Sequence, residues 1–222
     1  MNIFIVLFMN ILYIIFMKRC EGEKVMARGF SEEDMIKIKK DLQVACEESW
    51  RVRGYKQTNI PLLTKTVGIS SGAFYLVYKR KEDLFIDVLE NVQNKLLDTW
   101  SHFLDESDEK IEGFKKGLQW LFKEYKTYPA LYDLNSSEYD LFLAKLPEEQ
   151  VEELRINSSE IFRTVIKRSK LTLLLPEDEV MNIIHSILFL SLVDRDALHG
   201  TEKTFNFLLD NILTKLFKEE NK

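Results

Sequence analysis

A run of basic side chains without acidic ones carries the clearest chemistry in this sequence. Between Ser49 and Lys81 there are seven Lys or Arg residues and no Asp or Glu, although the 222-residue chain has a formal net charge of −5. Ammonium and guanidinium groups gathered in this way suit the neutralisation of backbone phosphates in a nucleic acid. The alternative is a solvated basic face, so the segment needs a structural context before it is given a partner.

Small residues follow a glycine inside the same segment. Gly68 stands between two short helical patterns, and Ser70, Ser71 and Gly72 open the second of them. A glycine permits a steep turn between helices, and small residues let the N–H groups at a helix start approach a phosphate or a base edge. The pattern predicts a helix-turn-helix.

The elements that must position these residues are short helices around a small core. We expect a helix that begins in a capping box at Ser31 and ends at Gly54. A second helix is expected to be capped by Thr58 and to end at the glycine turn, and a third to begin at the twin serines. A fourth, longer helix is expected from Glu82.

The later half also follows the helical period, and no stretch alternates convincingly with period two. The sequence has only 8 Gly and 4 Pro, which favours an all-α fold of roughly eight or nine helices. The later helices are expected over 109–127 and 130–145, from Pro147 onward, from Pro176 to Gly200, and from a cap at Thr201 onward.

Residues 54–85 resemble the DNA-binding domain of TetR (tetracycline-repressor-type) transcriptional regulators and read GYKQTNIPLLTKTVGISSGAFYLVYKRKEDLF. The likeness extends over about residues 35–92. It implies a three-helix DNA-binding domain at 32–92 and an effector-binding and dimerisation domain at 93–222. The family usually has alanine where this chain has Thr64 and Val67, phenylalanine in place of Tyr78, and a small polar residue in place of Arg80.

The resemblance also implies which residues touch double-stranded DNA. By position these are Thr58, Ser70, Ser71, Gly72, Tyr75, Tyr78 and Lys81, to which charge alone adds Lys65 and Lys79. Tyr75 and Tyr78 have an alternative role, since either ring would also cover the small three-helix core.

The C-terminal half is expected to sense a small molecule of unknown identity and to form a homodimer. The last two helices have wide apolar stripes that would build a four-helix interface, or else fill the core of their own subunit. A pocket for an apolar or aromatic effector is expected among aromatic residues that could equally be plain core. The favoured ones are Trp100, Phe103, Trp120, Tyr125 and Tyr128; Phe114, Phe122, Tyr132 and Phe142 complete the group.

Enzyme chemistry is not expected, because the sequence has no nucleophile elbow, phosphate loop, HExxH motif or carboxylate pair with a placed base. Three scattered histidines and two cysteines, Cys20 and Cys46, do not have metal-ligand spacing, so neither metal nor cofactor is expected. The expected protein is a cytoplasmic repressor that binds a palindromic operator as a dimer. A helical adaptor that binds only proteins is a further alternative.

Residues 3–17 are almost wholly apolar, with Asn10 as the one polar side chain. The stretch is shorter than the roughly 20 residues of a membrane-spanning helix and lacks the basic start of a signal peptide. Three interpretations of residues 1–25 stay open: a mis-assigned start with Met26 as the native first residue, a membrane anchor for a tethered sensor-regulator, or a helix packed on the protein. A membrane contact is expected only through residues 3–17.

Overall fold

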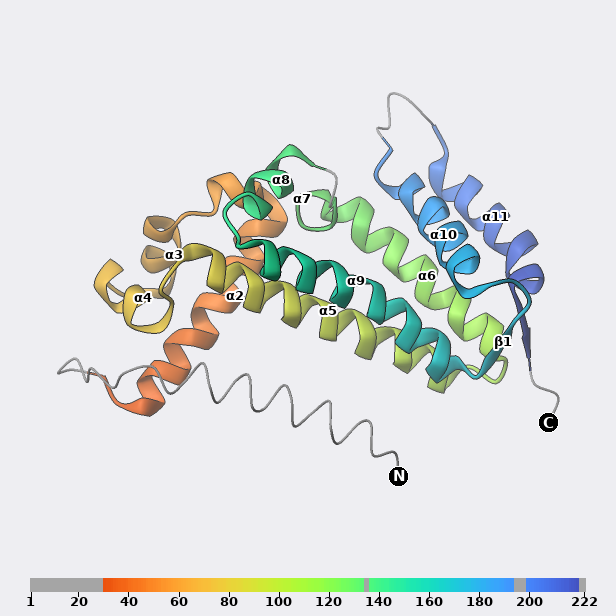
Figure 1. Ribbon diagram of the computed structural model, residues 1–222, viewed down its shortest axis with the longest axis horizontal. Coiled ribbons are helices and arrows are strands. Elements are labelled where there is room, and N and C mark those ends of the chain that lie inside the picture. The colour runs from red at the N-terminus through yellow and green to blue at the C-terminus, as the bar shows by residue number, and fades with distance from the viewer. Residues whose placement is uncertain (1–29, 134–135, 194–198, 220–222) are drawn as a thin grey trace. The chain divides into compact units, whose positions relative to one another are not determined.

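The computed structural model describes residues 30–133, 136–193 and 199–219, except for the side chains of 155–159 (Figure 1). The expectations for residues 1–25 lie outside the described residues. The first described helix, α2 (Glu32–Gln57), begins at a capping box in which Asp34 N donates to Ser31 Oγ at 3.1 Å and Ser31 N donates to Asp34 Oδ2 at 2.9 Å. The helical conformation breaks at Gly54, whose φ of 77° is readily adopted only by glycine.

Helices α3 (Ile60–Val67) and α4 (Ser71–Val77) follow, bent by 97° relative to each other. Gly68 ends α3 with a φ of 77°, and the Ser70 hydroxyl caps α4 by accepting the Ala73 N–H at 3.1 Å. The expected cap at Thr58 is wrong, because Asn59 Oδ1 accepts the Leu62 N–H and caps α3 instead. Over the described ranges, no single helix has the length and apolar character needed to cross a membrane, and only the bent α3–α4 pair meets those criteria jointly.

One aromatic cluster holds together the three-helix module, which consists of α2, α3 and α4 with the start of α5. Trp50 of α2 lies against Phe85 of α5 (Lys81–Glu106), with ring centroids 4.5 Å apart. Leu63 of α3 and Phe74 of α4 are fully buried in the same core. Because each short helix contributes one large apolar side chain, the module depends on tertiary packing rather than on helix propensity.

Helix α5 continues beside α6 (Lys110–Thr127) and α9 (Glu148–Ser169) (Figure 1). Two glycines let α6 approach α5 closely. A Cβ at Gly113 would lie 2.7 Å from the Phe103 carbonyl oxygen, and one at Gly117 would overlap the Trp100 indole. These glycines set the helix spacing next to Trp100.

The remaining helices are α7 (Pro129–Tyr132), α8 (Ser137–Leu143), α10 (Glu177–Leu188), a 3-10 turn (Phe189–Ser191) and α11 (Thr201–Leu216). The all-α class is confirmed, with two local corrections. Strands β1 (Leu171–Leu173) and β2 (Phe217–Glu219) form a small antiparallel sheet. Strands of three residues are too short for an alternating pattern in the sequence to predict them. Gly200, in the left-handed conformation, stands at the N-cap of α11 in place of the expected Thr201.

Candidate nucleic-acid interface and ligand pocket

The start of α4 is open to solvent. Ser70, Ser71 and Gly72 are exposed, and the Tyr75 side chain is 54% exposed. Lys65 on α3 and Lys79 after α4 are exposed as well. A helix start with free N–H groups, a phenol and two flanking ammonium groups has the donors that contact the DNA backbone.

Thr58 does not belong to that exposed surface. Its side chain is fully buried, and its Oγ1 lies 2.9 Å from the Ser49 hydroxyl of α2. The hydroxyl therefore ties the loop before α3 to α2, and its side chain is not available to a duplex in this conformation.

Tyr78 is also buried, at 4% exposure. Its hydroxyl donates to Asp87 Oδ2 at 2.9 Å and accepts from Gln43 Nε2 at 3.1 Å. Burial, followed by the Asp87 carboxylate, raises the pKa of Tyr78 far above its ordinary value. Of its two expected roles, the covering of the core matches this placement, because the ring joins α4 to α2 and α5.

Lys81 is engaged within the module. Its Nζ donates to the Tyr55 carbonyl oxygen at 2.7 Å and lies 3.8 Å from the centroid of the Tyr55 ring and 4.8 Å from that of Phe85. Burial lowers the pKa of this ammonium group. Lys81 thus stabilises the junction between α2 and α5, and a phosphate would have to compete with these contacts.

Sequence reasoning left Lys56 unassigned, although it lies in the acid-free run. The structure exposes it in the last turn of α2. The residues that remain open are the cations Arg53, Lys56, Lys65 and Lys79 and, at and after the start of α4, Ser70, Ser71, Gly72 and Tyr75.

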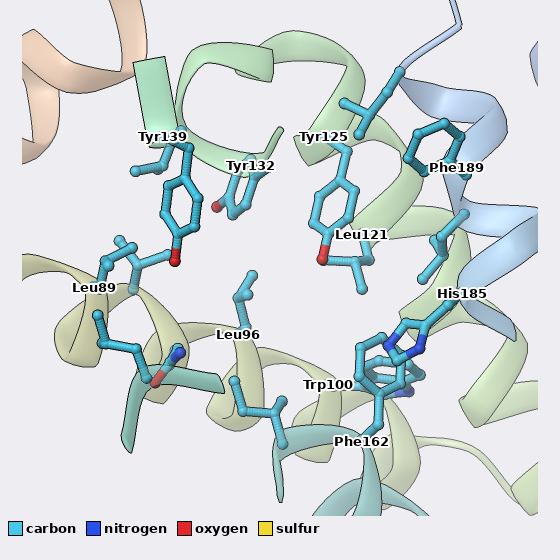
Figure 2. Close-up of a pocket in the computed structure, with 17 residues that line it drawn as sticks. Leu89, Leu96, Trp100, Leu121, Tyr125, Tyr132, Tyr139, Phe162, His185 and Phe189 are labelled. Carbon is cyan, nitrogen blue, oxygen red and sulfur yellow. The ribbon is translucent and has the colours of Figure 1, made fainter. Parts of the chain in front are cut away.

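A cavity of about 370 Å³ lies between α5, α6, α7, α8, α9 and α10 (Figure 2). Tyr125, Tyr132 and Tyr139 enter from one side, and Leu89 and Leu96 of α5 face them. The full lining comprises Leu89, Val92, Gln93, Leu96, Trp100, Leu121, Tyr125, Leu131, Tyr132, Tyr139, Leu154, Ile161, Phe162, His185, Leu188, Phe189 and Leu192.

Two of the five favoured aromatic residues, Trp100 and Tyr125, line this cavity. The other three do not. Phe103 and Trp120 pair with each other at 6.3 Å between ring centroids, and Tyr128 lies under the Arg51 guanidinium at 4.6 Å. The spacing of residues along one helix predicts which of them share a face, but it does not predict which other helix packs against that face. These three side chains therefore point away from the cavity.

Several residues that line the cavity were not among those expected from the sequence. Tyr139, Phe162 and His185 come from helices far apart in the chain, and no spacing within one helix links them. Tyr132 belonged to the aromatic residues expected near the pocket, but it was not one of the five favoured ones.

The cavity offers polar groups but no fixed charge. Among its seventeen described lining residues there is no Asp, Glu, Lys or Arg. Burial lowers the pKa of His185 below its usual value and raises the pKa of Tyr125 to about 12. At neutral pH the His185 ring is therefore uncharged and the Tyr125 phenol protonated, so the cavity suits an uncharged molecule with a large apolar surface.

Comparison of the structure with solved structures identifies its fold. A TetR-family transcription regulator from Marinobacter aquaeolei VT8 aligns over 85% of this chain and 100% of its own, with a TM-score of 0.55 and 16% identity. A TetR-family regulator from Pectobacterium atrosepticum aligns over 86% and 100%, with a TM-score of 0.56 and 14% identity. The chain has the TetR fold.

Another solved structure, a putative fatty acid metabolism regulator from Clostridium perfringens, aligns with this TetR fold over 81% of the chain and 100% of its own. Its TM-score is 0.56 and its identity 17%. No family model and no curated protein matches the sequence. In this TetR fold, α3 and α4 form the helix-turn-helix, and the cavity lies among the helices that follow.

Proposed function

We propose that the chain is a DNA-binding transcription regulator, a ligand-responsive repressor that acts in the cytoplasm as a homodimer on a palindromic operator. The observation that carries the proposal is the exposed start of α4, with Ser71, Gly72 and Tyr75 open and Lys65 and Lys79 beside it. The described part of the segment from Ser49 to Lys81 contains no carboxylate that would repel a duplex. The similar structures are TetR-family transcription regulators, which supports this choice over a protein-binding adaptor.

The proposed dimer interface is the outer face of α10 and α11. Phe207 of α11 is 66% exposed, and Phe189, in the 3-10 turn after α10, is 50% exposed although it also lines the cavity. Large apolar side chains exposed on adjacent helices favour association with a second copy. A two-fold axis through this face would present two α4 helices to two half-sites of a palindrome.

We expect selection from a random DNA pool at controlled salt to enrich a palindromic sequence. The logarithm of the affinity should fall linearly with the logarithm of salt concentration, because each neutralised phosphate releases counterions. A dimer that contacts six or more phosphates would lose roughly 10³-fold in affinity between 50 and 200 mM salt. Failure to enrich any sequence, or a flat salt dependence, would refute the DNA-binding proposal.

The proposed effector is an uncharged, mainly apolar molecule that occupies the cavity. Two similar structures are a putative regulator of fatty acid metabolism from Clostridium perfringens and a regulator of fatty acid degradation from Bacillus halodurans. In this chain, however, no lysine or arginine is among the described residues of the cavity lining to pair with a free carboxylate. We therefore favour a neutral ligand over a fatty acid anion.

His185 provides a pH test of the neutral ligand. Since burial lowers its pKa, the ring is neutral at pH 7 and gains a proton only as the pH falls through that lowered value. A neutral ligand desolvates the ring further, so protonation and binding oppose each other. We expect the Kd of the uncharged fluorescent probe N-phenyl-1-naphthylamine to be constant from about pH 7 to 8 and to rise as the pH falls through the lowered pKa of His185.

Substitution of the ring checks this assignment by fluorescence titration. His185→Phe should abolish the pH dependence, whereas His102→Gln, on α5 and outside the described cavity lining, should retain it. An unchanged pH profile in His185→Phe would show that another group controls binding.

A further inference from the structure

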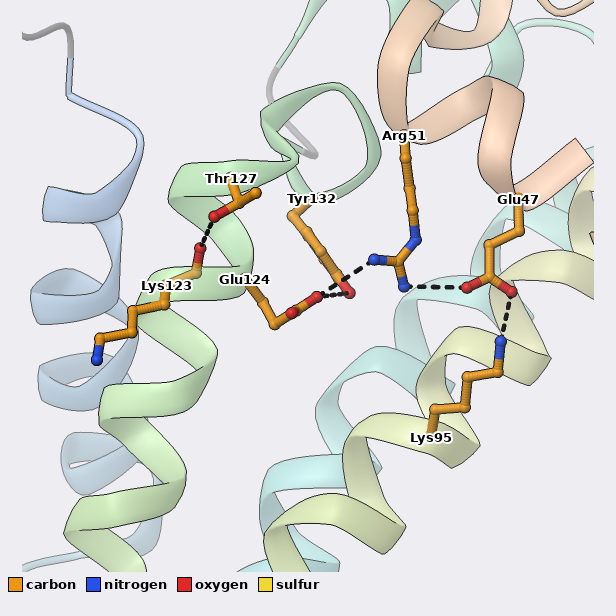
Figure 3. A network of polar contacts seen from close by, with 7 residues as sticks. All are labelled: Glu47, Arg51, Lys95, Lys123, Glu124, Thr127 and Tyr132. Atoms are coloured by element: carbon orange, nitrogen blue, oxygen red, sulfur yellow. Dashed lines mark hydrogen bonds and ion pairs between the residues drawn. The ribbon is translucent and has the colours of Figure 1, made fainter.

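A continuous chain of polar contacts leads from the cavity to α2 (Figure 3). The Tyr132 hydroxyl donates to Glu124 Oε2 at 3.3 Å, and the same oxygen lies 3.4 Å from Arg51 Nη1. Arg51 Nη2 donates to Glu47 Oε1 at 2.9 Å, and Lys95 Nζ lies 2.6 Å from Glu47 Oε2. These five side chains, from Tyr132 to Lys95, are called the polar relay below.

The polar relay joins two functional parts of the chain. At one end, Tyr132 lines the cavity and stacks on Tyr125, with centroids 4.8 Å apart and an interplanar angle of 19°. In its middle, on α2, Arg51 follows Trp50, the aromatic residue of α2 at the centre of the three-helix module. A displacement of the Tyr132 ring therefore has a short polar path to the helix that supports α3 and α4.

The charges in the middle of the polar relay are shielded from solvent. The side chains of Glu47, Arg51 and Glu124 are only 12%, 21% and 23% exposed. Burial alone would lower the pKa of Arg51, but Tyr132, Glu47 and Glu124 more than offset it and raise the pKa overall. Partly buried ion pairs are screened less by salt than surface pairs. The loss of one contact here would therefore change the electrostatic interactions of the neighbouring charges.

The Tyr132 hydroxyl and Arg51 share one acceptor, Glu124 Oε2. If the Tyr132 phenol moves away, the Glu124 carboxylate is free to turn fully toward Arg51. The relative strength of the two ion pairs that Arg51 makes, with Glu124 and with Glu47, then changes. Because Glu47 and Arg51 are one turn apart on α2, that balance acts on a single turn of the helix.

We propose that the polar relay transmits occupancy of the cavity to α2, with Tyr132 as the switch and Arg51 as the positioning residue that receives it. This inference rests on the proposed function of the cavity as an effector site. A ligand that packs against Tyr132 favours one arrangement of the Glu124–Arg51 contact, and through it one position of the module. Three other routes compete with it: continuous α5, Phe142 of α8, which contacts Trp50 and Phe85, and Glu138 of α8, whose Oε2 accepts the Lys56 N–H of α2 at 3.3 Å.

Tyr132→Phe separates the polar relay from these routes. The substitution keeps the ring in the cavity wall and removes only the hydroxyl that Glu124 accepts. Tyr125→Phe is the matched control, because Tyr125 also lines the cavity but its hydroxyl makes no hydrogen bond to a described residue. Arg51→Met, checked for an unchanged thermal transition, breaks the polar relay in its middle, on α2.

The experiment is hydrogen–deuterium exchange of the full chain with and without saturating N-phenyl-1-naphthylamine, read separately in the cavity helices and in residues 45–57 of α2. In the wild type we expect the probe to change exchange in both regions, by about 5-fold or more in α2. Tyr132→Phe and Arg51→Met should retain the response of α6 and α10 and lose most of the response in α2. Tyr125→Phe should keep both responses once the probe is saturating.

Three results would overturn the inference. An α2 response that survives in Tyr132→Phe would assign the coupling to α5 or α8, and a wild type without any α2 response would show that the halves are uncoupled. Failure of the probe to bind would overturn both this inference and the effector part of the proposed function. The experiment contains no DNA, so a chain that shows the predicted exchange but enriches no operator would retain the polar relay and lose the DNA-binding proposal.

Discussion

Tyr75→Glu should reduce operator affinity by about 100-fold or more at low salt without unfolding the protein. Tyr75 is 54% exposed on α4, so the change leaves no cavity in the core. It removes a phenol that we expect to reach a phosphate and adds a carboxylate facing the duplex. Each lost contact costs about 1–3 kcal/mol, and a dimer carries the substitution twice. Fluorescence anisotropy with the selected operator measures the affinity, and circular dichroism checks the fold.

The matched control for this substitution is Leu174→Glu. Leu174 is 48% exposed and lies directly after β1, far along the chain from the helix-turn-helix, and the change alters net charge by the same amount. It should change operator affinity by less than about 3-fold, since exposed charges more than a Debye length apart are largely screened. Equal losses in both variants would mean that net charge, rather than contact at α4, governs binding.

Gly117→Ala should destabilise the protein strongly. The new Cβ would overlap the Trp100 indole, so the buried ring or one of the two packed helices must shift. Overpacking of this kind costs about 1–3 kcal/mol, which lowers Tm by roughly 3–10 °C in a chain of this size. Since Trp100 also lines the cavity, binding of N-phenyl-1-naphthylamine should weaken in the same variant.

Two further variants test the cause of that loss by thermal unfolding. Adding Trp100→Phe to Gly117→Ala should restore part of the stability, because the smaller ring vacates the space. The buried Trp100 Nε1 has no hydrogen-bond partner among the described residues, so the exchange loses no such bond. Gly72→Ala should be neutral or stabilising, because its new Cβ would meet only Ser70 Oγ at 3.6 Å. A Gly117→Ala protein as stable as the wild type would contradict the predicted overlap.

The helices of the module follow from local rules that the sequence already contains. Gly68 in the left-handed conformation and Ser70 at a helix start are found as expected, because both effects act within a few residues. Thr58 and Asn59 are both good caps, and the sequence could not say which would be buried. The structure uses Asn59 as the cap because the Thr58 hydroxyl pairs with Ser49 of the preceding helix.

The same distinction applies to the expected DNA contacts. Tyr75 is exposed and Tyr78 is buried, but their residue type and charge could not predict this difference, because both are tyrosines three residues apart on one short segment. Asp87 and Gln43, each on a different helix, decide the matter by accepting from and donating to the Tyr78 hydroxyl. Lys81 was expected to contribute charge at the interface, but a carbonyl and two aromatic rings from its own module surround its ammonium group.

By itself the sequence determined the all-α class, the helix-turn-helix and the acid-free basic segment, because helical period, caps and charge are properties of neighbouring residues. Only the tertiary structure decided which side chains enclose the cavity and that a polar path joins it to α2. Tyr132, Glu124 and Arg51 stand on three helices, and their approach depends on how those helices pack. Packing depends on complementary shape across distant segments, which no local pattern encodes.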